Sequence, residues 1–192
     1  LPIPERSVAC RCRAGWVAAR ARDLPSNAQD YVDGFAAPYF EVMSEWFGLL
    51  RIGMPGGALD RLVNEKLPYE RYGITLNAGH LIHLDEWVSS PIYPGSDIPL
   101  HSGMVIQVDV IPSSPTYYST RMEDGVVIAD EELQSALAAE YPDCYARCRR
   151  RRVFMSDVLG IELPREILPL SNIPAIVPPF FLAPNTVLAL EL

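Results

Sequence analysis

The chain has 192 residues, of which 49% are hydrophobic and 21% are charged, and its formal net charge is −8. This length predicts one large domain with a sizeable core, and no apolar run is long enough to span a membrane. The acidic balance argues against a general nucleic-acid binder, so we expect neither nucleic acid nor a membrane as a partner.

Residues 1–25 contain Pro2, Pro4 and alternating arginine and alanine, with no sustained hydrophobic period. We expect a poorly ordered arm here, flexible or extended. The stretch is basic but has no continuous apolar segment behind it, so it does not resemble a signal peptide. Because the first residue is Leu1 and not methionine, we interpret the chain as a processed or partial product.

A helical stripe follows the arm. Ser26 is a plausible N-cap, and Pro38 should kink the helix or divide it. Residues 53–57 are rich in glycine and end this helix, and a second helix is expected over 58–67. The apolar residues of the first stripe recur at spacings of three and four: Tyr31, Phe35, Tyr39, Val42, Met43, Trp46 and Leu50.

From residue 74 the pattern changes to short strands and then to helices. The expected helices cover 130–139 and 143–159, within a main domain of residues 26–160. Residues 161–192 are rich in proline and apolar side chains, so we expect a tail packed on the domain or on a partner. The expected strands are 74–76, 81–84, 104–111, 116–120 and 126–129.

The four cysteines occur as Cys10-Arg-Cys12 and as Cys144 and Cys148. Neither spacing is the two-residue gap of zinc ribbons and redox motifs, so we expect a cytoplasmic protein. Cys144 and Cys148 are one helical turn apart, which suits either a metal or two half-buried thiols. The basic run 147–152 suits either a phosphate or a solvated helix face.

Three segments carry side chains typical of a metal or catalytic centre. The first is Gly79-His-Leu-Ile-His-Leu-Asp-Glu-Trp87, which contains His80 and His83. The others are the strand-like run 103–111 with Asp109 and the run 121–128 with Glu123. One imidazole and two carboxylates, each on a β-type segment, can converge on a divalent metal if the strands lie side by side.

The order of these motifs resembles the C-terminal half of the pita-bread metallopeptidase domain over about residues 40–130. That family holds methionine aminopeptidase, aminopeptidase P, prolidase and the metal-free creatinase. The motifs are a Pro-Gly turn between two helices, then Gly-His-x-x-x-Leu-Asp, Gly-Met-Val-x-x-Val-Asp and Arg-x-Glu-Asp-x-Val-x-Ile. The expected fold is α+β: a curved, mainly antiparallel sheet covered on one side by helices, in an incomplete pita-bread-like domain.

The resemblance implies a role for each matching residue. His80, Asp109 and Glu123 would be metal ligands. Arg121 would contact Glu123 without binding the metal itself. Asp109 stands where the family has a glutamate, and it would also be the catalytic base with His80. The resemblance implies manganese, cobalt or zinc as the metal, and a complete family site holds two ions about 3.5–4 Å apart. The alternative is that this chain binds fewer ions or none.

The sequence also departs from the family pattern. The family's two earlier aspartate ligands have no counterpart, because Asp30 and Asp33 lie in an expected helix. Trp87 occupies the position of a later family histidine. His83 replaces a family glycine, and with Asp85 it is a candidate substitute ligand.

Three functional hypotheses therefore remain open. The leading one is a metal-dependent peptidase of the Xaa-Pro aminopeptidase or dipeptidase type, acting on a peptide or dipeptide through a metal-bound hydroxide, as a homodimer. The second is a catalytically inactive pita-bread-like binding protein. The third is a metal-free, creatinase-like hydrolase in which His80 shuttles protons.

Overall fold

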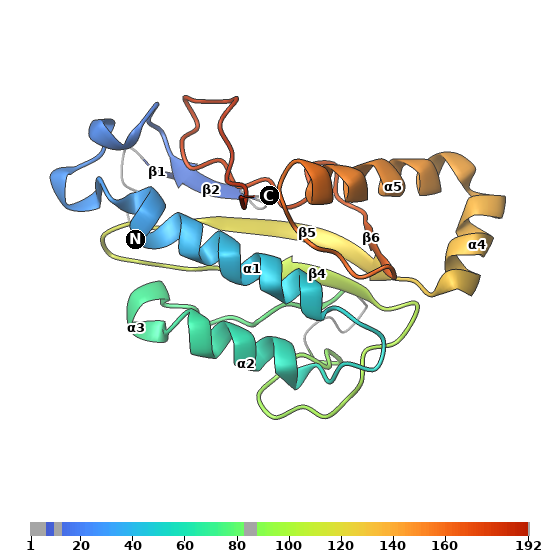
Figure 1. Ribbon diagram of the computed structural model, residues 1–192. Helices are drawn as coiled ribbons and strands as arrows, with labels where there is room; N and C mark the ends of the chain where they lie inside the picture. Colours follow the sequence, from blue (N-terminus) through green and yellow to red (C-terminus); the bar gives the residue numbers. More distant parts are fainter. Residues whose placement is uncertain (1–6, 10–12, 83–87, 192) are drawn as a thin grey trace.

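The computed structural model describes residues 7–9, 13–82 and 88–191 (Figure 1). Within these residues it is an α+β protein built on one antiparallel sheet. The strands are β1 (Ser7–Ala9), β2 (Arg13–Trp16), β3 (His80–Leu81), β4 (Val105–Asp109), β5 (Arg121–Ile128) and β6 (Ile167–Pro169). The helices are α1 (Ala37–Leu49), α2 (Gly57–Lys66), α3 (Tyr69–Tyr72), α4 (Glu131–Glu140) and α5 (Pro142–Asp157), with short turns η1 (Ala21–Asp23), η2 (Ser26–Ala28) and η3 (Val32–Ala36).

Strand β5 is the centre of the sheet. The strand order is β1-β2-β5-β4-β3, and β6 also pairs with β5. One edge of β5 pairs with β4 over most of its length. Its other edge pairs with β2 at its beginning and with β6 at its end. Because β2 is near the N-terminus and β6 is near the C-terminus, β5 joins elements from both ends of the chain.

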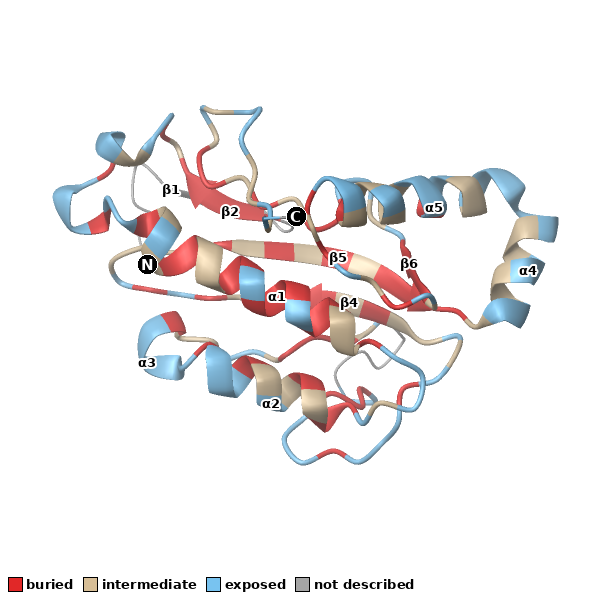
Figure 2. Cartoon of the chain, in the orientation of Figure 1, coloured by how far each residue is buried: buried red, intermediate tan, exposed pale blue. Residues whose placement is uncertain are grey.

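The face of the sheet that carries Ile106, Val108, Met122 and Val126 forms the main core with α1. These side chains are at most 1% exposed, and Figure 2 shows the buried stripe of α1 beside the sheet. Tyr39 anchors the contact: its hydroxyl donates to Val110 O at 3.0 Å and accepts from Met122 N at 3.1 Å. The helix is therefore held by apolar packing and by hydrogen bonds to the strand ends.

The expected helix over 26–50 is divided. A 3-10 turn and a π turn precede α1, and Pro38 lies in the first turn of α1. Proline is tolerated there because the first amide groups of a helix have no intrahelical acceptor. The predicted stripe is otherwise confirmed, since Tyr31, Phe35 and Trp46 are fully buried.

The opposite face of the sheet is divided into an apolar half and a polar half. Val105 and Val127 face each other across β4 and β5, and they pack with Leu168 of β6 against α4 and α5. Helices therefore lie against both faces, where the sequence predicted cover on one side. The polar half of this second face holds the histidine and carboxylates considered below.

The terminal segments pair with each other beside the core. Trp16 of β2 is 2% exposed, its amide donates to Pro179 O, and its carbonyl accepts from Phe181 N. Residues 13–16, expected in a poorly ordered arm, thus join the sheet through β5 and the C-terminal tail. The tail packs on the domain at a further point, where Leu190 N donates to Leu159 O.

Two expected strands are absent from the described structure. Residues 74–76 form an irregular connection after Gly73, which ends α3 in a left-handed conformation with φ 52°. Residues 116–120 belong to a turn closed by two backbone hydrogen bonds between Ser114 and Tyr118. The Ser114 hydroxyl accepts from the amides of Thr116 and Tyr117, which stabilises that turn in place of a strand.

Candidate functional site

Strand pairing brings the predicted site residues to the polar half of one sheet face. His80 pairs with Gln107, and Asp109 pairs with Glu123. Residues directly opposite each other share a face, as do residues two apart along a strand. His80, Gln107, Asp109 and Glu123 therefore lie on the same face, turned away from α1.

His80 and Asp109 form a close, enclosed pair. The imidazole Nε2 of His80 lies 3.6 Å from Asp109 Oδ2, and each side chain is 9% exposed. The other ring nitrogen, Nδ1, lies 2.8 Å from the carbonyl oxygen of Leu81. Because a carbonyl oxygen can only accept, Nδ1 carries a hydrogen there. In the neutral ring Nε2 would then present a lone pair to the Asp109 carboxylate, and the two would repel each other. A proton between Nε2 and Asp109 Oδ2 removes this repulsion.

The surroundings of Asp109 favour that shared proton. Burial raises the pKa of the Asp109 carboxyl, while the charges of His80 and Arg121 and the Asn77 amide lower it in part. Neither Asp109 Oδ1 nor Asn77 Nδ2 forms a regular hydrogen bond within the described structure. The Asn77 amide still acts on the Asp109 carboxyl, through a contact outside regular hydrogen-bond geometry.

Glu123 is the second carboxyl group of the site. Gln107 Nε2 donates to Glu123 Oε1 at 3.4 Å, and both side chains are half-buried. Burial and the Asp109 charge raise the pKa of Glu123, and Arg121 lowers it. The sequence motifs predicted Glu123 and Arg121 but missed Gln107 and Asn77. Gln107 could have been found from its place two residues before Asp109 in the same strand.

The described residues do not complete a metal site. In residues 7–9, 13–82 and 88–191 no group of three or more histidine, cysteine, aspartate or glutamate side chains is placed to hold a metal ion. His80, Asp109 and Glu123 are all within this part of the chain. The substitute ligands His83 and Asp85, and Trp87, lie outside the described residues.

The remaining candidate residues lie elsewhere. Asp30 accepts a hydrogen bond from the Tyr117 hydroxyl at 2.9 Å, and Asp33 lies in the turn η3. Cys144 and Cys148 are free thiols on α5, and Cys10 and Cys12 lie outside the described residues. In the basic run, Arg151 donates to Leu170 O at 3.0 Å and Arg152 to Ile167 O at 3.0 Å. These two arginines fasten α5 to the β6 segment.

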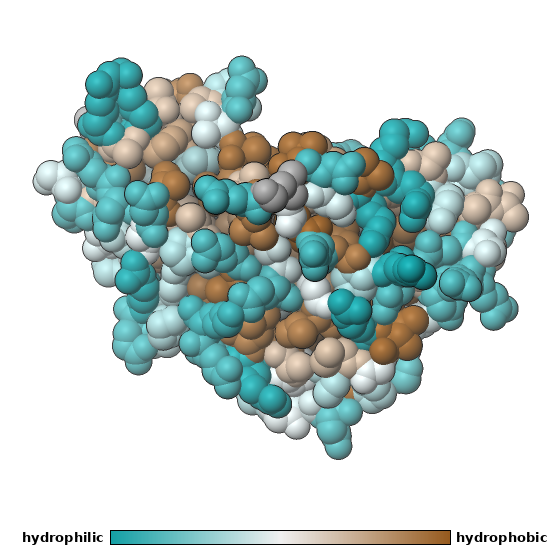
Figure 3. All heavy atoms as spheres, viewed as in Figure 1, coloured by the Kyte–Doolittle hydropathy of each residue, from teal (hydrophilic) through white to brown (hydrophobic). Residues whose placement is uncertain are grey.

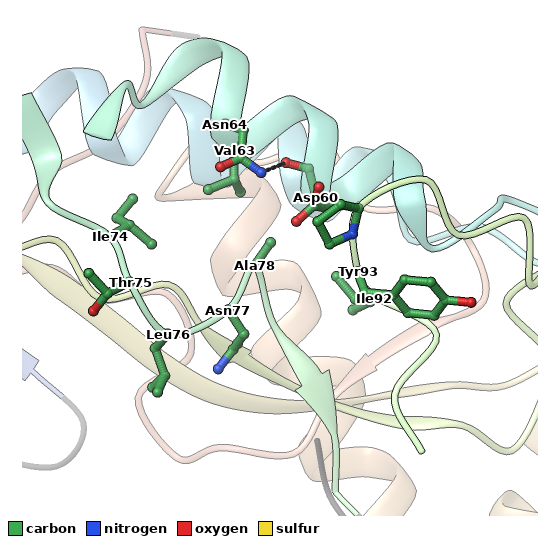
Figure 4. Close-up of a pocket in the computed structure, with 11 residues that line it drawn as sticks. Asp60, Val63, Asn64, Ile74, Thr75, Leu76, Asn77, Ala78, Ile92 and Tyr93 are labelled. Atoms are coloured by element: carbon green, nitrogen blue, oxygen red, sulfur yellow. Dashed lines mark hydrogen bonds between the residues drawn. The ribbon is translucent and has the colours of Figure 1, made fainter. Parts of the chain in front are cut away.

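A groove of about 330 Å³ lies between α2 and the connection 74–78 (Figure 4). Asp60 and Asn64 line it from α2, and Ile92 and Tyr93 line it from the following loop. Burial raises the pKa of Asp60. Asn77 connects the groove with the site, because it lines the groove while its amide acts on Asp109. A ligand in the groove would therefore lie near the His80–Asp109 pair.

The fold and the site together define an α+β protein with an ionisable cluster on one sheet face. No known protein-family model matches the chain, and a comparison with curated proteins found no match. In the described part of the chain, no helix has both the length and the apolar character needed to cross a membrane.

Proposed function

We propose that the chain is a pita-bread-like hydrolase of C–N bonds that uses the His80–Asp109 pair as its acid–base centre. The observation that carries this proposal is the 3.6 Å approach of His80 Nε2 to Asp109 Oδ2 in an enclosed, partly polar site. An imidazole oriented by a carboxylate is a common arrangement for proton transfer in catalysis. The motif order described above supports the pita-bread-like assignment.

The chemistry follows from the positions of the three ionisable groups. The Asp109 carboxylate accepts a proton from a water molecule, which attacks the carbonyl carbon of an amide-type substrate. His80 holds that carboxylate in place through Nε2, while its Nδ1 donates to Leu81 O. Glu123, directly across from Asp109, donates a proton to the departing nitrogen. Burial favours the protonated form of Glu123, which suits it to this role.

This proposal differs from the metal-dependent peptidase that the sequence motifs favoured. The histidine and carboxylate side chains of the described residues do not form a set that fits a metal ion. A manganese, cobalt or zinc enzyme would need donors from outside the described residues. The metal-free hypothesis is supported by the strand register, which puts His80, Asp109 and Glu123 on one sheet face.

A second candidate is a binding protein without catalysis. The observation that favours it is the Gln107–Glu123 hydrogen bond, which engages a carboxylate that the hydrolase needs. In that case His80, Asp109 and Glu123 form a structural network on the sheet face.

Hydrolysis assays separate the candidates. Xaa-Pro dipeptides, longer peptides with proline second, and creatine would be incubated with the purified chain, with and without EDTA. The proposal expects turnover that persists in EDTA and is lost in His80→Gln. Turnover that needs added manganese, cobalt or zinc would support the metal-dependent peptidase instead. If no substrate is hydrolysed under either condition, the binding protein is favoured.

A further inference from the structure

An apolar cavity of about 330 Å³ lies between the α4–α5 hairpin and the apolar half of the second sheet face. Val105 and Val127 form its floor, Leu133 and Leu137 of α4 form one wall, and Cys148 of α5 forms another. Figure 1 shows the hairpin at the end of the sheet where β5 and β6 run together. The cavity is therefore separate from the His80–Asp109 site, although both lie on the same face of the sheet.

The α4 side of the hairpin is incompletely packed over this cavity. None of the residues of α4 is buried, and Leu133 and Leu137 are only half-buried above a floor of valines. The cavity is partly open to solvent, so its apolar lining lacks the dispersion contacts of a close-packed interior. A hydrocarbon in this space would restore those contacts and bury both leucines further.

The lining favours a neutral occupant. No charged side chain is among the described residues that line the cavity. The Tyr145 hydroxyl donates to Gln134 Oε1 at 3.2 Å, so its hydrogen is engaged. Burial raises the pKa of the Cys148 thiol, so this group stays uncharged. Arg151 lies 3.9 Å from Cys148 Sγ but donates to Leu170 O at 3.0 Å.

We infer that this cavity is a binding site for a neutral apolar small molecule, one with an aromatic ring or a short aliphatic chain. Pockets of this size that bind small ligands are typically lined by apolar side chains, and apolar cavities in proteins take up hydrocarbons such as benzene. The few polar groups at the wall, already engaged or uncharged, give no means of holding an ionic head group. The inference is independent of the proposed hydrolase activity.

Binding of naphthalene, with naphthalene-2-sulfonate as the charged analogue, tests this site. The purified chain should bind naphthalene saturably and melt at a higher temperature in its presence, whereas the sulfonate should bind at least tenfold more weakly. Equal or tighter binding of the sulfonate would overturn the inference, because it would indicate the basic surface of α5.

A matched pair of variants on α4 locates the site. Leu137→Trp fills the cavity and should weaken naphthalene binding at least tenfold, whereas Ala139→Trp, on the exposed side of the same helix, should leave it unchanged. If Leu137→Trp does not fold, methyl NMR of the parent chain decides. Naphthalene should shift the signals of Leu133, Leu137 and Val127. Shifts confined to other methyl groups, or no saturable binding, would overturn the inference.

Discussion

Glu123 and Asp124 are neighbours in β5, yet their carboxylates lie on opposite faces of the sheet. Glu123 is half-buried beside Asp109, whereas Asp124 is 1% exposed and faces the core side. Arg13 Nη2 lies 3.0 Å and 3.1 Å from the two oxygens of Asp124, and Ala175 N donates to Oδ2 at 2.9 Å. Strand β5 thus supplies the Glu123 carboxylate to the candidate site. Its Asp124 carboxylate links the two ends of the chain by binding both Arg13 and Ala175.

The first prediction concerns this buried ion pair. Asp124→Ala should lower the free energy of unfolding by about 3–5 kcal/mol, because it leaves the buried charge of Arg13 without its carboxylate. Glu123→Gln, the control on the same strand, should change stability by less than about 1 kcal/mol. Urea denaturation of both variants measures the difference. Equal losses would show that the Arg13–Asp124 pair has no special role in joining the termini.

The second prediction separates chemistry from packing at the site. His80→Ala should abolish hydrolysis but cost less stability than Ile106→Ala, which opens a cavity in the core and should cost about 2–5 kcal/mol. Ile106 is fully buried under α1, whereas His80 lies on the polar half of the other face. Thermal melting and release of proline check both parts. A His80→Ala protein that melts as early as Ile106→Ala would make His80 a structural residue.

The third prediction uses two glycines with opposite surroundings. A Cβ on Gly56 would lie 2.2 Å from the backbone oxygen of Pro91, so Gly56→Ala should destabilise the fold by about 1–3 kcal/mol. Gly48 lies inside α1, where the nearest atom to a new Cβ is Glu162 O at 3.9 Å. Gly48→Ala should therefore stabilise by about 0.5–1 kcal/mol, since alanine favours helix more than glycine does. Chemical denaturation gives both values, and a stabilised Gly56→Ala protein would contradict the packing described here.

The fourth prediction concerns alkaline stability. Burial raises the pKa of Tyr31 from 10.0 to about 12, and its hydroxyl donates to Ser119 O at 3.1 Å. Between pH 10 and 12 the unfolded chain loses this proton and the folded chain keeps it, so stability falls as pH rises. For this single group the fall should be about 2–3 kcal/mol. Tyr31→Phe should be somewhat less stable at pH 8 but should lose less stability by pH 12, as denaturation at both pH values would show. Parallel losses in parent and variant would mean that Tyr31 does not contribute.

The fifth prediction concerns metal. Calorimetry with manganese, cobalt and zinc should show weak binding, because the described residues do not form a group of three suitable ligands. Asp109→Asn serves as the control, and it should reduce whatever weak binding is seen. Tight binding of two ions per chain would show that residues such as His83 and Asp85 complete a site, and it would favour the metal-dependent peptidase.

The candidate site was only partly predictable. His80, Asp109 and Glu123 stand out in the sequence because histidine and carboxylate side chains occur there within short β-type motifs. Asn77 and Gln107 do not stand out, because a single amide side chain is common on any protein surface. The spacing along β4 puts Gln107 on the face of Asp109, but only the strand register shows that it lies opposite His80. Asn77 lies outside the strands, and only the tertiary structure brings it to Asp109.

Strand β2 shows why part of the fold was not predictable. Residues 13–16 are all buried, so they lack the alternation of apolar and polar side chains that marks a half-exposed strand. An arginine within the segment further suggests an exposed arm. Its charge is balanced by Asp124, which is 111 positions away in the sequence.

The sequence by itself determined the buried stripe of α1, strand β4 and the last residues of β5, because a hydrophobic period of 3.6 or 2 is a local property of the chain. Within β4 it also determined which side chains share a face. Only the tertiary structure decided that Arg13 meets Asp124, that helices cover both faces, and that His80 lies 3.6 Å from Asp109. These contacts join residues distant in the chain, and their geometry depends on register and packing, which no local period specifies.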